Sequence, residues 1–416
     1  MIYRYSLANG LRVVIEDIPF VRSVSMGVWV LTGSRDENPE QSGISHFLEH
    51  MFFKGTSKLS ARELAEVFDG IGGNINAYTT KEYTCFHAKV LDEHMDLAMR
   101  TLADMLFDSV FDPVELEREK RVVIEEIKMY EDNPEEAVHD QIIEATYAGH
   151  PLGANILGTE ESLIQLDRQR LIDYIDSRYT PDNMVVSVSG HVMVAEVLAL
   201  IETLFGGVRR ETKTFVSQGP TFIPARVYNK RPIEQMHACL AVPSFAYADE
   251  SMYGLILLNN ILGASSSSRL FQEIREERGM AYNVFSYYSA FRDTGLFLVY
   301  FGSSPSQSQE VGELILKIVH DVLRDGVTED ELKTAKNQVI GSLLLGTEST
   351  SNRMSRIGKN ELLLGRQVEI DEVTQAVSKV NRTDLHDIAQ KLFQTPFSYV
   401  ALGPSERSFS LKGEAL

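Results

Sequence analysis

The feature that most constrains the fold is a weak internal repeat, in which two parts of the chain share a residue pattern. Residues 115–126 match residues 331–342 at a constant offset of 216. An earlier pair, 42–44 and 253–255, fits less tightly. Self-similarity of this kind indicates duplication, and 416 residues suffice for two or three domains with real cores. The repeat therefore predicts two related domains.

Strand-like and helical patterns alternate in both halves. Runs at 11–16, 24–31 and 184–189 are typical of strands, and long helical patterns lie between them. Short turns without strict strand–helix–strand units favour an α+β fold. We therefore expect two homologous domains, each a mainly antiparallel sheet packed with helices.

The domain boundary is predicted from a loss of helical periodicity between residues 206 and 232. An Arg-Arg pair, a Gly-Pro pair and a further Pro occur there. We expect an N-terminal domain over residues 1–212, a linker over 213–228 and a C-terminal domain over 229–416.

Composition excludes several classes of protein. The chain has 40 Lys and Arg against 59 Asp and Glu, a net charge of −19, which argues against nucleic-acid binding. No stretch is apolar enough for a membrane span, and the start lacks the pattern of a signal peptide, so we expect a cytoplasmic protein. Two distant cysteines, Cys85 and Cys239, exclude a disulfide framework.

The strongest chemical signal is an H-x-x-E-H pattern in a segment with helical periodicity, residues 41–54. On a helix, His46 and His50 lie one turn apart, about 40° around the axis, so both imidazoles can reach one ion. Glu49 lies about 60° to the other side of His46. Its carboxylate could then take a proton from a bound water. This arrangement is the inverted zinc-peptidase motif.

A catalytic zinc usually has a third protein ligand. The helix expected over residues 113–130 offers Glu119 and Glu126, seven residues apart and on nearly the same face. One of them could bind the metal while the other orients a ligand. Spacing alone leaves Glu119, Glu125 and Glu126 open as the third ligand.

Longer motifs resemble one family of zinc peptidases. The segments HFLEHMFFKGT, GGNINAYTTKEYT and ELEREKRVVIEEIKMYEDNP are similar to pitrilysin, insulin-degrading enzyme and the mitochondrial processing peptidase. The resemblance covers nearly the whole chain and implies a processing-peptidase-like metallohydrolase fold. In that family the third ligand follows the second His by about 76 residues, which implies Glu126. Glu119 then matches the carboxylate that orients a ligand.

The same resemblance implies roles for other residues. Asn76, Ala77 and Tyr78 match the edge strand along which family substrates lie. Arg275 and Tyr282 match an Arg and a Tyr that contact substrate and steady the tetrahedral intermediate. The second half cannot hold the same metal, because Glu126 falls on Ser342 under the repeat.

The resemblance implies a zinc-dependent endopeptidase with one Zn²⁺ per chain, Glu49 as general base, and peptides or unfolded polypeptides as substrates. Full-length relatives have four such domains around a chamber, so this half-length chain is expected to form a homodimer, with Arg275 and Tyr282 serving the partner's metal. The alternative is a non-catalytic or obligate-heterodimer subunit of a processing-peptidase-like complex. Neither nucleic acid nor a membrane is an expected partner.

Overall fold

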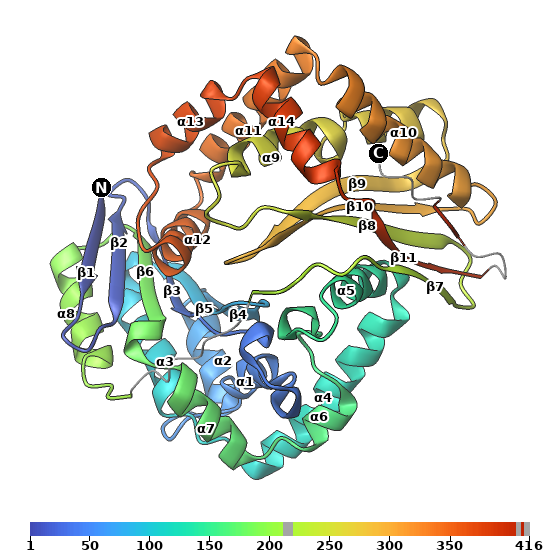
Figure 1. Cartoon of the computed structure of the whole chain (residues 1–416). Coiled ribbons are helices and arrows are strands. Elements are labelled where there is room, and N and C mark those ends of the chain that lie inside the picture. The colour runs from blue at the N-terminus through green and yellow to red at the C-terminus, as the bar shows by residue number, and fades with distance from the viewer. Residues whose placement is uncertain (211–218, 405–408, 412–416) are drawn as a thin grey trace. The chain divides into compact units, whose positions relative to one another are not determined.

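The computed structural model describes residues 1–210, 219–404 and 409–411 and has the expected α+β architecture (Figure 1). Two compact units are present, each built on one sheet. Unit 1 comprises Met1–Lys128, Ala154–Ser217 and Gly346–Gln367, and unit 2 comprises Met129–Gly153, Gln218–Leu345 and Val368–Leu416.

Unit 1 contains a six-stranded sheet of order β1-β2-β6-β3-β5-β4. The strands are β1 (Ile2–Ser6), β2 (Arg12–Asp17), β3 (Ser23–Val30), β4 (Asn74–Thr79), β5 (Thr84–Leu91) and β6 (Met184–Gly190). Neighbours are antiparallel except β2 and β6, which are parallel. The helices are α1 (Ile44–Met51), α2 (Ala61–Gly70), α3 (Met95–Phe107), α4 (Pro113–Asp132), α6 (Glu160–Ile164), α7 (Arg168–Arg178), α8 (Val194–Phe205) and α12 (Thr350–Lys359), and the last four residues of α4 belong to unit 2.

Unit 2 contains a five-stranded sheet of order β7-β11-β8-β10-β9. The strands are β7 (Arg226–Lys230), β8 (Met236–Ser244), β9 (Ala281–Ala290), β10 (Gly295–Ser303) and β11 (Ser398–Gly403). Only β7 and β11 pair in parallel. The helices are α5 (Pro134–Thr146), α9 (Met252–Asn259), α10 (Ser308–Asp325), α11 (Glu329–Gly346), α13 (Ile370–Lys379) and α14 (Arg382–Phe393).

The two units repeat one topology, as the sequence repeat predicts. The order β2-β6-β3-β5-β4 of unit 1 corresponds strand for strand to β7-β11-β8-β10-β9 of unit 2, including the single parallel pair. The offset of 216 residues relates the start of α4 to the start of α11, and the start of α5 to the start of α12. Among the strands of the described residues, only β1 has no counterpart in unit 2.

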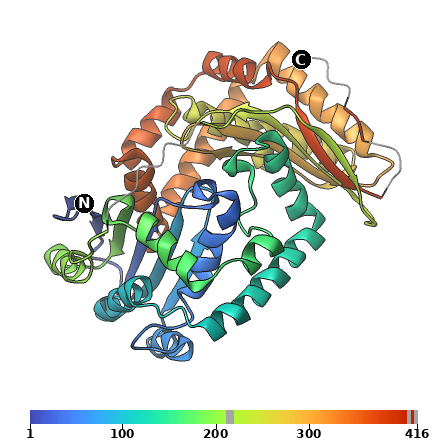
Figure 2. The same ribbon diagram turned by 60° about the horizontal axis from the view of Figure 1, so that its bottom comes forward.

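The compact units are not contiguous in the sequence, which differs from the expected division into 1–212 and 229–416. Helix α12 packs on β3 and β6 of unit 1, and α5 packs on β8 and β11 of unit 2 (Figures 1 and 2). Each sheet thus has one face covered by a helix from the opposite half of the chain. Residues 213–218 of the expected linker lie outside the described residues, and residues 226–228 of the linker belong to β7.

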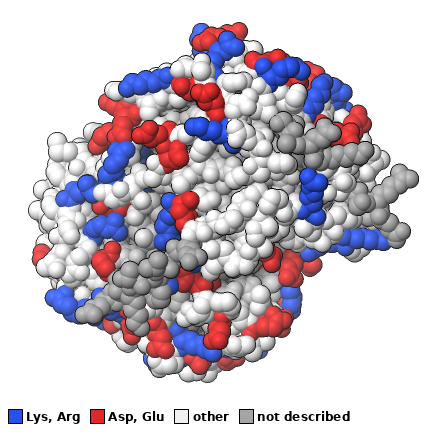
Figure 3. All heavy atoms as spheres, in the orientation of Figure 1, with Lys and Arg blue, Asp and Glu red and all other residues white. Residues whose placement is uncertain are grey.

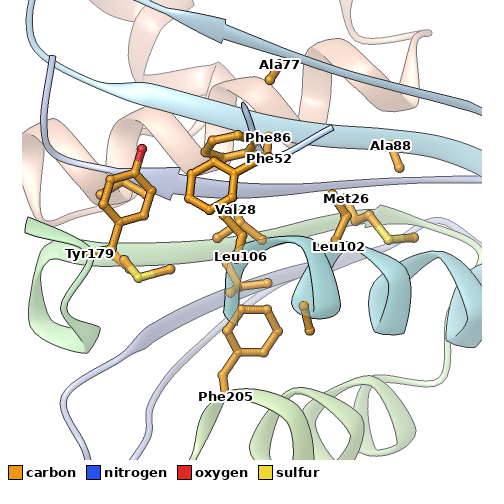
Figure 4. Packing of buried hydrophobic residues seen from close by; sticks show 14 of the residues in the cluster. Met26, Val28, Phe52, Ala77, Phe86, Ala88, Leu102, Leu106, Tyr179 and Phe205 are labelled. Carbon is orange, nitrogen blue, oxygen red and sulfur yellow. The ribbon is translucent and has the colours of Figure 1, made fainter. Parts of the chain in front are cut away.

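Both faces of each sheet are therefore buried. In unit 1, α12 places Met354 and Ile357 against Trp29, while the opposite face forms the larger core shown in Figure 4. Within that core the rings of Phe52 and Phe86 meet edge to face, with their centroids 5.1 Å apart. Burying each such side chain stabilises the fold by roughly 1.5–3 kcal/mol. A sheet buried on both faces explains why every residue of β6 is buried.

Local signals near the candidate site agree with the structure. The segment expected to be helical over 41–54 forms α1, which is shorter at both ends. Ser60 and Glu63 form a capping box before α2, in which each side chain accepts a hydrogen bond from the backbone N–H of the other residue. Asp112 accepts hydrogen bonds from the first turn of α4, so the expected helix over 113–130 begins at its predicted residue.

Charged side chains of both signs are interspersed over the face seen in Figure 3, where they form no single basic patch. Within the described residues, no helix combines the length and apolar character needed to cross a membrane.

The contact of α12 with the sheet gives a stability prediction. A methyl group added at Gly358 would lie 2.2 Å from Nε1 of Trp29, which is fully buried and donates a hydrogen bond to Ser187. Gly358→Ala is therefore expected to lower the free energy of unfolding by about 1–3 kcal/mol through overpacking, measured by urea denaturation.

The matched control is Gly341→Ala in α11, where an added methyl meets nothing within 4 Å. Helix propensity alone should then raise stability by up to about 1 kcal/mol. Equal changes in the free energy of unfolding for the two variants would contradict the close contact of α12 with Trp29.

Candidate metal centre

Two imidazoles of the centre come from α1, whose apolar residues share one face and whose polar residues share the other. Phe47, Leu48 and Met51 enter the core of unit 1. His46 and His50 then lie together, with ring centroids 4.6 Å apart. The one-turn spacing of the motif therefore brings both rings to one place.

The third group comes from α4. The Oε2 atom of Glu126 lies 3.5 Å from Nε2 of His50 and 3.9 Å from Nε2 of His46. One ligand atom from each of the three residues lies within 4.8 Å of the other two. No other group of this kind occurs in the part of the chain that the structure describes. Of the three acids left open by spacing, the structure thus brings Glu126 to the two histidines.

This donor set fits a zinc ion. Two imidazole nitrogens and one carboxylate form a known ligand set for catalytic zinc, with bonds of about 2.0–2.2 Å and one position left open. A ligand imidazole must be neutral. Burial, and then the neighbouring His50, lowers the pKa of His46 to about 3, so His46 is neutral near pH 7. His46, His50 and Glu126 could therefore hold the ion.

Glu119 contacts His50 at the ring nitrogen other than the one near Glu126. Its Oε1 atom lies 2.8 Å from Nδ1 of His50, and its Oε2 atom lies 2.7 Å from Nζ of Lys54. Burial raises the pKa of Glu119, but the hydrogen bonds with His50 and Lys54 outweigh it, and the net pKa is lowered. The ionised carboxylate keeps the proton on Nδ1, which leaves the Nε2 lone pair facing Glu126.

Glu49 is fixed beside the three candidate ligands by strand β4. The hydroxyl of Thr79 donates a hydrogen bond to its Oε2 atom at 2.6 Å. Burial raises the pKa of Glu49, although the Thr79 hydrogen bond opposes that rise. A carboxylate of raised pKa is a better proton acceptor near neutral pH than an ordinary one.

The expected substrate strand is an edge strand. Asn76, Ala77 and Tyr78 lie in β4, which pairs with β5 and ends the strand order of unit 1. Ala77 faces the core on the side of α1, whereas the Tyr78 ring packs near Trp29 on the opposite face. Among the described residues, no strand pairs with the outer edge of β4.

A pocket of about 290 Å³ opens beside this strand. Side chains from α2, α3 and β4 line it together with Phe53, which follows α1, and most are apolar: Leu64, Phe68, Ile75 and Met105. An apolar side chain would fit there.

Arg275 and Tyr282 meet each other in unit 2, whereas the candidate ligands belong to unit 1. The guanidinium carbon of Arg275 lies 4.5 Å from the Tyr282 ring centroid and 4.7 Å from that of Phe271. Tyr282 is 73% exposed at the start of β9. Stacking between two rings fixes the guanidinium beside an exposed phenol.

Sequence reasoning anticipated Glu119 but missed two other supporting residues, Lys54 beside Glu119 and Thr79 beside Glu49. Lys54 follows His50 by four residues, a helical spacing that could have indicated it. Thr79 directly follows the predicted substrate strand residues, but its contact with Glu49 has no signal in the sequence. The pocket had no sequence signal, because its lining comes from three separate elements.

Comparison with family models gives two matches. The model described as "Insulinase (Peptidase family M16)" matches residues 12–160, and the one described as "Peptidase M16 inactive domain" matches residues 165–339. The H-x-x-E-H motif falls in the first match and is absent from the second.

Relatives match along almost the whole chain. A Bacillus subtilis protein named "Uncharacterized zinc protease YmxG" is 48% identical over 97% of this chain and 99% of its own length. An uncharacterized zinc protease of Mycobacterium leprae is 39% identical over 96% of this chain and 91% of its own length. The solved structure of a protease from Helicobacter pylori has a TM-score of 0.91 at 22% identity, covering 97% of this chain and 99% of that one, which supports the fold.

The geometry predicts which acid matters for metal binding. Replacing Glu126 by Gln removes a charged ligand, so zinc affinity is expected to fall by more than the 10–100-fold typical of residues that only support a ligand. Competition with a chelating dye measures it. Glu125→Gln is the matched control, since Glu125 is exposed and pairs with Lys128. Equal losses in the two variants would contradict the assignment of Glu126.

Proposed function

The chain belongs to the M16 family of peptidases, and from this we propose that it is a zinc-dependent endopeptidase that cleaves peptides or unfolded polypeptides. The observation that carries the proposal is the convergence of His46, His50 and Glu126, with Glu49 held beside them. The zinc protease names of the relatives support the same metal.

Each residue of the centre has a distinct task in the proposed reaction. When bound, zinc polarises a carbonyl and brings the pKa of a coordinated water towards about 7. Glu49 accepts a proton from the attacking water and delivers it to the nitrogen of the leaving amine. Glu119 keeps the Nε2 lone pair of His50 available throughout.

The edge of β4 supports a peptide as substrate. An extended peptide can add to a free edge through main-chain hydrogen bonds, which select for backbone more than for side chains. Asn76, Ala77 and Tyr78 would provide that edge, beginning three residues before Thr79, which holds Glu49. The apolar pocket beside β4 would take one substrate side chain.

We extend the proposal to assembly. A half-length chain of this family would close a clamshell chamber as a homodimer, and Arg275 with Tyr282 would stabilise the reacting carbonyl at the partner's metal. The exposed phenol beside a fixed guanidinium suits such a role.

The general base has a direct test. Glu49→Gln is expected to retain zinc and to lose cleavage of an unstructured peptide by about 10²–10⁴-fold, the usual contribution of a general base. Metal content and cleavage are measured on the same preparation, with Glu125→Gln as the control that keeps both. A wild-type chain that binds zinc but cleaves nothing would favour a non-catalytic subunit, or one that needs a different partner.

Sharing across subunits is tested by mixing two inactive variants. Glu49→Gln and Tyr282→Phe chains are each expected to be impaired alone. If the metal of one chain uses Tyr282 of the other, a re-associated mixture should regain up to about a quarter of wild-type activity, because a mixed dimer then has one intact site. No recovery in dimers shown to have exchanged chains would reject sharing.

A further inference from the structure

Helix α1, which supplies both histidines, begins without a side-chain cap of its own. Its N-cap is Gly43, with φ 87°, and a Cβ there would lie 2.6 Å from the carbonyl oxygen of Leu157. Glycine therefore fits where a capping side chain does not. The first N–H groups of a helix need partners from elsewhere in that case.

Glu37 provides those partners from the preceding segment. One of its carboxylate oxygens accepts a hydrogen bond from the N–H of Gly43 at 2.7 Å, and the other accepts from the N–H of Ser45 at 2.8 Å. A negative charge at this end also suits the helix dipole. The start of α1 is thus fixed by a carboxylate six residues before its N-cap.

The surroundings of Glu37 form a buried polar cluster. Glu37 is only 5% exposed, and Ser45 is fully buried beside it. The hydroxyl of Tyr174, from α7, lies 2.8 Å from those of Ser45 and Thr32. The cluster ties α1 to two other segments of unit 1 at the residue before His46.

Stability alone does not explain a carboxylate at this place. Burial raises the pKa of Glu37 to about 7, although the hydrogen bonds from Ser45 and Gly43 oppose the rise. A folded-state pKa above the unfolded value means that the free energy of unfolding falls as pH rises from about 4.5 towards 7. Above that range the free energy of unfolding stays at its lower level. The two hydrogen bonds to the start of α1 are the observation that supports a positioning role for Glu37.

We propose that Glu37 is a positioning residue for the metal centre, which fixes the start of α1 and with it the direction of the Nε2 atoms of His46 and His50. The inference rests on the proposed zinc site. Helix α1 has only eight residues, so a shift at its start reaches both ligands. Metal geometry tolerates displacements of about 0.5 Å at most.

The test compares zinc affinity with stability in the full chain. Glu37→Gln leaves one acceptor oxygen for two N–H groups, and we expect zinc affinity to fall about 10-fold or more, in the range for groups that orient ligands. The matched control is Glu361→Gln, which removes another buried carboxylate of unit 1, paired with Arg4. It should lower the melting temperature of the zinc-free chain and leave zinc affinity unchanged.

A second variant keeps the test decisive if Glu37→Gln does not fold. Glu37→Asp retains the charge but is one methylene shorter, so it cannot reach both N–H groups, and zinc affinity should fall in the same direction. Wild-type affinity in the folded Glu37 variants would overturn the inference. A wild-type chain without measurable zinc binding would instead refute the proposed function.

Discussion

The arrangement of the candidate centre depends on the contacts of the ionised Glu119 carboxylate, because they join the two helices that supply the candidate ligands. One oxygen of Glu119 contacts Nδ1 of His50 in α1, and the other contacts Lys54, which follows α1. Glu126 lies seven residues after Glu119 on α4, on nearly the same face of that helix. A single buried carboxylate therefore links one candidate ligand on α1, and the lysine that follows α1, to the helix that carries another candidate ligand. A neutral residue in place of Glu119 would remove the ion pair of Lys54.

The duplicated topology explains why only one unit carries this chemistry. Helices α4 and α11 occupy equivalent places in the two sheets, yet Ser342 stands where Glu126 stands in unit 1. The second copy retains the scaffold without the ligands, and its distinctive surface feature is the stacked Arg275 beside Tyr282. Within the described residues, one unit thus carries the candidate metal ligands and its duplicate does not.

Much of this could be predicted from the sequence, and the exceptions have physical causes. The spacing of His46 and His50 places both on one helix face, and the capping box at Ser60 involves residues only three apart in the sequence. Both features can therefore be predicted from the sequence. The choice of Glu126 needed family resemblance, since Glu125 is only 100° away on the same helix. The role of Glu37 depends on how a loop returns to the start of α1, which no periodicity encodes. The sequence could not show that α5 and α12 pack on the sheet of the opposite half, because the repeated elements occur in the same order in both halves.

The exchange of α5 and α12 bears on how the molecule is made. During synthesis the strands of the unit 1 sheet leave the ribosome long before Gly346–Gln367 has been made. Until then the apolar face of the sheet around Trp29 is not covered by α12. Neither half of the polypeptide carries everything its own sheet requires. Folding of both units therefore finishes late, and a nascent chain of this design is exposed to aggregation until residues 346–367, in its last sixth, have emerged.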